Sequence, residues 1–184
     1  MRKTLLLLVC FCLLAAPAAF AQFRTANLGA FDMVLADDFH NGFNYMNKFT
    51  PDNLFNGYQI KKGDVFELKM TFTSSRDLEE KTQDGKDNNR QLQIGLCSFA
   101  PPSHWFQISW DDSQKVSLGK VENVRAGQTY SVTLTLTAIR DAPGPAALQN
   151  GIVFLTDGTG RRRNNGGAMG PVTLKFTEFV LTKK

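Results

Sequence analysis

Hydrophobic and polar residues alternate with a period of two along much of the chain. The clearest run is 130–138, where Tyr130, Val132 and Leu134 alternate with serine and threonine. Such alternation is typical of strands that bury one face. The predicted strands cover 65–73, 91–99, 105–111, 130–138, 151–156 and 172–181.

The last predicted strand contains an irregularity. Phe176 and Phe179 are three positions apart, which breaks the alternation. We therefore expect a β-bulge near Thr177 and Glu178, because a bulge inserts one extra residue into a strand.

Turn signals separate the predicted strands. Tight glycine turns are expected at 62–64, 126–128 and 157–158, and longer loops at 74–90, 140–150 and 159–171, with one helical turn near 77–81. Short strands at this spacing, each with one polar face, predict an all-β fold of two antiparallel sheets packed as a β-sandwich.

The same alternation assigns individual side chains to faces. Leu92, Ile94 and Leu96 are predicted to face the core, with Cys97 on the opposite side. Trp110 has the parity of Phe106 and Ile108 and is expected in the core. Trp105 has the parity of Gln107 and Ser109 and is expected to face outward.

The first 21 residues have the features of a signal peptide. Arg2 and Lys3 precede an apolar run at 5–16, and Ala19-Phe20-Ala21 offers small residues at a cleavage site before Gln22. The apolar run is shorter than the roughly 20 residues that a membrane-spanning helix needs. We therefore expect an exported protein, periplasmic or secreted, with one domain at 22–184 and no membrane span.

Cleavage changes the charge and the cysteine count. Loss of Arg2 and Lys3 lowers the formal net charge from +4 to +2. So small a charge gives no reason to expect nucleic acid or a membrane surface as a partner. Cys97 is then the only cysteine, so an internal disulfide is excluded.

Three stretches carry a resemblance to a known family. Gly63-Asp64-Val65-Phe66-Glu67-Leu68 and Ala126-Gly127-Gln128-Thr129-Tyr130-Ser131-Val132 each open a strand after a glycine turn, and 172–181 closes the chain. Together these resemble the jelly-roll β-sandwich of carbohydrate-binding modules and related galactose-binding-like domains. The resemblance covers about 57–183, and Glu178 before Phe179-Val180 is similar to the family's final strand. It implies a jelly-roll sandwich that binds sugar.

The first candidate site is the polar face of a sheet. If the strands pair as the resemblance implies, one concave surface is shared by Lys69, Gln91, Gln93, Trp105 and Gln107. Sugars suit such a surface, because an aromatic ring stacks on their C–H face while amides bind their hydroxyl groups. The alternative is that these polar residues only solvate the outside of an antiparallel sheet.

The second candidate is the loop that leads into Trp105. Pro101 and Pro102 would hold His104 and Trp105 rigidly, as a recognition loop requires. Alternatively, the prolines enforce a turn and Trp105 covers a sheet edge. His104 with Cys97 is too weak a signal for thiol catalysis, since no third group orients the pair.

Two further clusters of side chains are candidates for ligand binding. The acidic and amide side chains of the N-terminal quarter, together with Glu178, would suit calcium. Turn chemistry is favoured, because the spacing matches no EF-hand loop and Asp and Asn are common turn residues. These side chains are Asp32, Asp37, Asp38, Asn41, Asn44, Asp52 and Asn53. Arg161-Arg162-Arg163 would bind an anionic glycan or an acidic patch of a partner. The alternative is that the three arginines lie in a solvated loop without a ligand. We predict no cofactor.

These observations favour a non-catalytic binding protein whose ligand is a carbohydrate or a cell-envelope glycan. The alternative is a structural or adhesive component that binds a protein partner in the envelope. An enzyme ranks third, because the sequence offers no defensible carboxylate pair, metal cluster or nucleophile motif. A glycan-binding protein would expose Trp105, whereas a structural protein would offer an apolar patch or an unpaired edge strand.

Overall fold

The structure of the chain is a computed structural model, and all regular elements among the residues that it describes are β-strands. The structure describes residues 23–35, 46–49, 54–78, 92–100, 104–110, 119–143, 149–156 and 172–184. Ten strands in this part of the chain form two antiparallel sheets.

The first sheet, sheet A, is built around the C-terminal strand. Its order is β1-β10-β4-β8, and β2 pairs with β10 as well. The strands are β1 (Thr25–Asn27), β2 (Phe31–Leu35), β4 (Val65–Ser74), β8 (Thr129–Thr137) and β10 (Val172–Lys183). β10 is therefore hydrogen-bonded to three other strands of the sheet.

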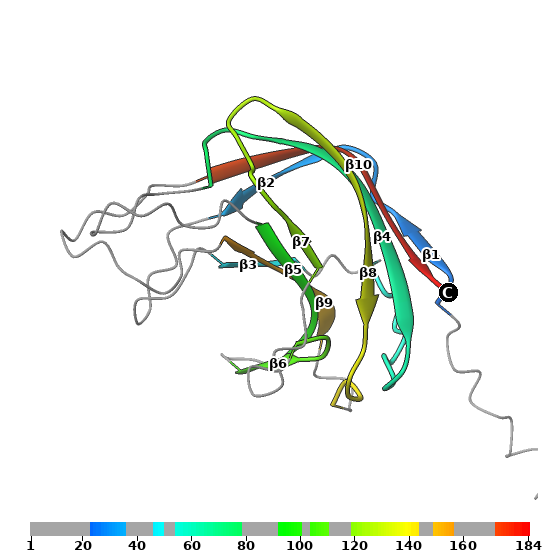
Figure 1. Cartoon of the computed structure of the whole chain (residues 1–184). Helices are drawn as coiled ribbons and strands as arrows, with labels where there is room; N and C mark the ends of the chain where they lie inside the picture. The colour runs from blue at the N-terminus through cyan, green and yellow to red at the C-terminus, as the bar shows by residue number, and fades with distance from the viewer. Residues whose placement is uncertain are drawn as a thin grey trace, which may run out of the picture.

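The second sheet, sheet B, is built around β5. Its order is β3-β9-β5-β6, and β7 pairs with another part of β5. The strands are β3 (Met46–Phe49), β5 (Leu92–Ala100), β6 (His104–Gln107), β7 (Gly119–Val121) and β9 (Gln149–Thr156). Figure 1 shows the strands of sheet B facing those of sheet A.

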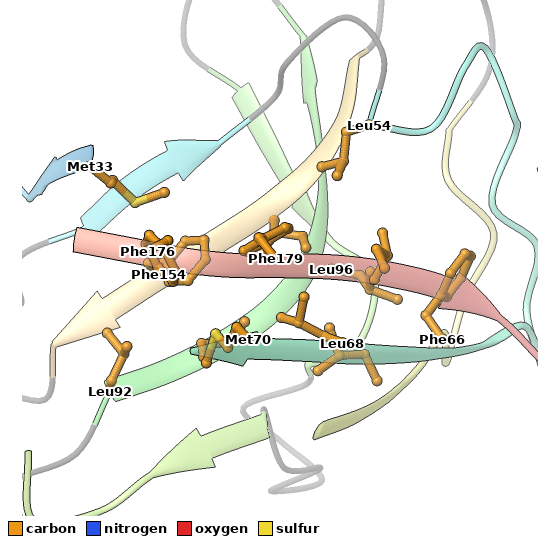
Figure 2. Close-up of a cluster of buried hydrophobic side chains, with 14 of the residues drawn as sticks. Met33, Leu54, Phe66, Leu68, Met70, Leu92, Leu96, Phe154, Phe176 and Phe179 are labelled. Carbon is orange, nitrogen blue, oxygen red and sulfur yellow. The ribbon is translucent and has the colours of Figure 1, made fainter. Parts of the chain in front are cut away.

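The core lies between the two sheets and is rich in phenylalanine. Phe154 of sheet B contacts Phe176 and Phe179 of sheet A, with ring centroids 5.9 and 6.4 Å apart. Figure 2 shows these rings beside Leu68, Met70 and other buried side chains that β4, β5, β9 and β10 contribute. Burying each such side chain contributes about 1.5–3 kcal/mol, so this layer holds the sheets together.

The fold class predicted from the alternation is confirmed. The structure is an all-β, two-sheet antiparallel sandwich, and the six predicted strands correspond to β4, β5, β6, β8, β9 and β10. The bulge is confirmed as well, because the register of β10 against β4 shifts between Phe176 and Glu178. The sequence analysis missed β1, β2, β3 and β7, which have only three to five residues each.

Two of the predicted glycine turns lie in the described residues. Gly63 and Gly127 adopt φ values of 89° and 71°, which suit glycine because it has no Cβ. The turn at 157–158 and the loop at 159–171 lie outside the described residues, as does most of the helical turn expected at 77–81.

Candidate functional site

Most of the residues predicted for the polar site belong to strands of sheet B. Gln93 of β5 pairs with Leu155 of β9 and with Lys120 of β7. Gln107 of β6 pairs with Cys97 of β5. Both glutamines are half-buried, and their positions alternate with the core residues of β5, so they lie on the side of sheet B that faces away from sheet A.

The backbone of β6 places two further candidates next to Gln107. His104 pairs with Ala100, and Trp105 pairs with Phe99. Trp105 is two residues from Gln107 along the strand, as the sequence analysis assumed. Gln91 lies outside the described residues. The structure therefore brings the backbone positions of Gln93, Trp105 and Gln107 into one sheet.

Lys69 does not belong to this site. It lies on β4 of sheet A, where its Nζ is 3.2 Å from Oε1 of Glu178 on β10. Thr71 donates a hydrogen bond to Oε2 of the same carboxylate at 3.2 Å. The expectation that Lys69 shares one surface with the glutamines is wrong, because alternation within a strand does not show which sheet the strand joins.

The centre of the outward side of sheet B is covered. Cys97 and Val153 are only 0% and 1% exposed although neither belongs to the core cluster between the sheets. Gly95 and Gly151, their register neighbours, are buried too. Cys97 does lie opposite the core residues of β5, as predicted. The prediction of an open polar face is therefore wrong at this centre. A substitution of Cys97 would alter a buried thiol and not an exposed one.

The end of β6 is fixed to β5 by a buried hydroxyl. Ser109 Oγ accepts a hydrogen bond from the Leu96 N–H at 2.8 Å, and the Ile108 N–H donates to the Leu96 carbonyl at 3.0 Å. Ser109 is therefore buried, although its parity predicted an outward position. Ile108 is in the core as predicted, whereas Trp110 is half-buried and not a core residue. The alternation fails here because regular strand geometry ends at Gln107.

A polar cluster that the sequence analysis missed joins the C-terminal strand to the turn before β4. Asp64 accepts hydrogen bonds from the Tyr58 hydroxyl and from the Lys61 N–H, at 2.7 and 2.8 Å. Lys183 Nζ lies 2.7 Å from Oδ1 of Asp64 and also donates to the Tyr58 hydroxyl. Tyr58 and Asp64 are six residues apart, but Lys183 is 125 residues from Tyr58, so no local motif marks the three together.

The electrostatics of this cluster favour charged Asp64 and Lys183. Burial alone would raise the pKa of Asp64, but the hydrogen bonds from Lys183, Lys61 and Tyr58 outweigh it and lower that pKa. Burial likewise opposes the charge of Lys183, but the bonds to Asp64 and Tyr58 raise its pKa overall. A carboxylate held in this way is a poor proton acceptor, so the cluster is suited to holding structure rather than to acid–base catalysis.

The remaining candidates offer little. Asp32 is exposed on β2 and pairs with Lys175, while the other N-terminal Asp and Asn residues considered for calcium lie outside the described residues, as do residues 161–163. In the described part of the chain, His, Cys, Asp and Glu form no group of three suited to a metal ion. Over the same residues, no helix has the length and hydropathy to cross a membrane.

Comparisons with known proteins found similarity among solved structures only. No protein-family model and no curated protein matches the chain. A structure titled "CBM4 structure and function" aligns with a TM-score of 0.45 and 14% identity, covering 84% of each chain. The N-terminal cellulose-binding domain of Cellulomonas fimi β-1,4-glucanase C aligns with a TM-score of 0.44 and 16% identity, covering 85% of this chain and 79% of that one.

A third solved structure aligns over a similar length. It is the CBM22-2 xylan-binding domain of Paenibacillus barcinonensis Xyn10C, with a TM-score of 0.38 and 9% identity, covering 88% of this chain and 92% of that one. The structures similar to this chain thus include carbohydrate-binding modules, the class of β-sandwich that the sequence resembles.

Proposed function

We propose that this chain is an exported, non-catalytic protein that binds a carbohydrate or a cell-envelope glycan on the outward side of sheet B. The observation that supports this most directly is the register of β5 with β6 and β7. It places Gln93, Gln107 and the backbone of Trp105 in one sheet. Amide side chains both donate and accept hydrogen bonds, which suits the hydroxyl groups of a sugar.

The spacing of the two glutamines indicates the size of the ligand. Gln107 pairs with Cys97, which is four residues from Gln93 along β5. At about 3.3 Å per residue and about 4.8 Å between strands, their Cα atoms are roughly 14 Å apart. This separation exceeds the length of one sugar ring, so a ligand that contacts both must be an extended oligosaccharide rather than a single sugar.

Paired measurements of binding and stability test this site. A glycan array would identify a ligand for the purified protein, and its affinity would then be measured for single variants. Loss of one neutral hydrogen bond costs about 0.5–1.5 kcal/mol, so Gln93→Ala and Gln107→Ala should each weaken binding roughly 2- to 10-fold. Trp105→Ala should remove most of the affinity if its ring stacks on the sugar.

The matched control is Lys69→Ala on sheet A. Lys69 is exposed, and its ion pair with Glu178 should contribute little to stability, so this variant should bind and melt like the parent protein. If Gln93→Ala, Trp105→Ala and Gln107→Ala all keep the parent affinity, sheet B is not the site. A glycan array without any bound sugar would contradict the proposed ligand class itself.

A second function is favoured by a different observation. The outer edge of β8 lacks a partner strand in the part of the chain that the structure describes. An edge of this kind suits a structural or adhesive component of the envelope, whose partners are proteins. Export, to the periplasm or beyond the cell, is common to both proposals and is supported by the signal-peptide features of residues 1–21.

A further inference from the structure

Within the described residues, the edge strand β8 has a row of backbone hydrogen-bonding groups that no other strand uses. All nine of its residues pair with β4 on one side. Among the described strands, none pairs with it on the other side. Figure 1 shows β8 at the border of sheet A, next to β4.

The hydrogen bonds at the end of β8 show which residues face this open side. The Ala138 N–H donates to the Asp64 carbonyl at 2.8 Å, and the Ala138 carbonyl accepts from the Gly63 N–H at 2.8 Å. Ala138 therefore faces β4, and every second residue before it does the same. The residues between them direct their N–H and C=O groups outward, and these are Thr129, Ser131, Thr133, Thr135 and Thr137.

The sequence and register of β8 lack the features by which an exposed edge strand protects itself. Edge strands are usually short, or they carry charges, proline or a bulge. The shorter edge strands β2, β3 and β7 carry Asp32, Lys48 and Lys120. β8 has nine residues, TYSVTLTLT, with no charge, proline or glycine, and its register against β4 is regular throughout.

Both ends of β8 are held in place. At its start, the Tyr130 hydroxyl accepts a hydrogen bond from the Arg125 N–H at 2.7 Å and donates to the Asn123 carbonyl at 2.8 Å. Just after its end, the Ile139 N–H donates to the Ile108 carbonyl of the other layer at 2.8 Å. β8 is therefore already ordered before a partner strand binds, which lowers the entropic cost of binding.

We propose that two copies of this chain associate through β8, antiparallel and around a two-fold axis at Thr133. In this register Thr133 pairs with Thr133 of the second copy, and Ser131 pairs with its Thr135. Each of these pairs exchanges both backbone hydrogen bonds. The two copies of sheet A become one continuous sheet, and the symmetry closes the assembly as a dimer.

The side chains of β8 fit this partner on both faces. On the outer face, the exposed threonine and serine side chains meet their own kind, and such cross-strand pairs stabilise sheets. On the inner face, Val132 and Leu134 are only half-buried. In the proposed register, Val132 of one copy lies opposite Leu134 of the other copy. Pairing would bury more of both. The dimer does not depend on the proposed sugar site, which lies on sheet B.

The mass of the purified full chain in solution tests the proposal. We expect sedimentation or light scattering to give twice the chain mass at micromolar concentration. The double variant Ser131→Lys with Thr135→Lys sets lysine against lysine at two places in the dimer, so it should halve the mass. Thr177→Lys, on an exposed residue of β10 away from the edge, is the matched control and should keep the parent mass.

A charge swap tests the register itself. In Ser131→Lys with Thr135→Glu, each new lysine faces a glutamate of the second copy only if the strands are antiparallel around Thr133. This variant should remain a dimer, whereas the double-lysine variant should be a monomer with an unchanged circular dichroism spectrum. A parent protein that stays monomeric, a double-lysine variant that stays dimeric, or assemblies that grow beyond two copies would each overturn the proposal.

Discussion

Asp64 is the residue whose charge is most closely tied to the fold. Its carboxylate accepts bonds from Tyr58 and Lys61 and forms an ion pair with Lys183, whose side chain is 25% exposed against 12% for Asp64. Water therefore screens this pair less than the exposed pairs elsewhere on the chain. Because Lys183 lies at the end of β10, the pair connects the C-terminus to the turn that begins β4.

This geometry predicts an acid-sensitive contribution to stability. The pKa of Asp64 is lowered from its ordinary value of 3.8, so the unfolded chain binds this proton more readily than the folded one. The contribution is therefore complete above the unfolded pKa and is lost as the pH falls through the folded pKa. Asp64→Asn should lower the free energy of unfolding by about 1–3 kcal/mol at pH 7 and flatten its pH dependence below about pH 4.

Urea unfolding measured from pH 2 to pH 7 checks this prediction. Glu122→Gln is a suitable control, because the side chains of Glu122 and of its ion-pair partner Lys120 are both more than half exposed. If the free energy of unfolding of Asp64→Asn still falls below pH 4 as steeply as that of the parent protein, the ion pair between Asp64 and Lys183 does not stabilise the fold.

At this scale the sequence predicts the orientation of a side chain but not its burial. Alternation places Cys97 opposite the core side of β5, and the structure agrees. It could not show that this second side is covered, because burial depends on segments far away in the sequence. The cluster around Asp64 was missed for the same reason.

Among the elements, β6 is the one whose geometry matters most for the proposed site. It has four residues and ends at Gln107, where the chain bends and the Ser109 hydroxyl takes over the hydrogen bond of the Leu96 N–H. This bond is buried, so water cannot replace it. The position of Gln107 beside Cys97 therefore depends on Ser109.

Removing this hydroxyl should weaken both the fold and the proposed site. Ser109→Ala leaves the Leu96 N–H without an acceptor in a buried place, which should lower the free energy of unfolding by about 1–3 kcal/mol. Ser109→Thr retains the hydroxyl and should recover part of the loss. Thermal unfolding of both variants checks this, and an alanine variant as stable as the parent would contradict the role given to Ser109.

At the scale of elements, length decides what the sequence predicts. Five of the six identified strands have eight or more residues, and the sixth, the four-residue β6, was found because the alternation continues in the sequence beyond its end. The missed strands have three to five residues, which is too few periods to be recognised. The bulge in β10 was predictable because Phe176 and Phe179 both face the core, which an unbroken strand does not permit.

For the whole molecule, the pairing of strands into sheets was the step that the sequence could not supply. Lys69 and Gln93 have similar local patterns, yet they lie on different sheets. A sandwich can be expected from alternation and turns, but its strand order depends on contacts between distant segments. Gln93 and Gln107 therefore share one sheet, as the sequence analysis assumed, whereas Lys69 belongs to the other sheet. Sugar binding by the two glutamines stays a prediction.

β10 is the strand on which the whole molecule depends. It pairs with β1, β2 and β4, and it contributes Phe176 and Phe179 to the contact between the sheets. β10 follows every other described strand in the sequence, so sheet A is completed only after β10 has been synthesised. A chain that stops at residue 171 lacks the centre of this sheet and much of the core, although it retains every other strand.

We therefore expect the chain truncated after residue 171 to lack a cooperative thermal transition. Its exposed core should bind the dye ANS, as compact states without specific packing do. Addition of a synthetic peptide covering 172–184 should restore a measurable transition, because the groove left between β2 and β4 offers hydrogen bonds on both sides. The same peptide with Phe176→Ala and Phe179→Ala should restore little, since it can pair with both strands but fills less of the core. If the truncated chain melts cooperatively at the parent's temperature, β10 is an accessory strand, and the core contacts that Figure 2 shows around Phe176 and Phe179 do not hold the two sheets together.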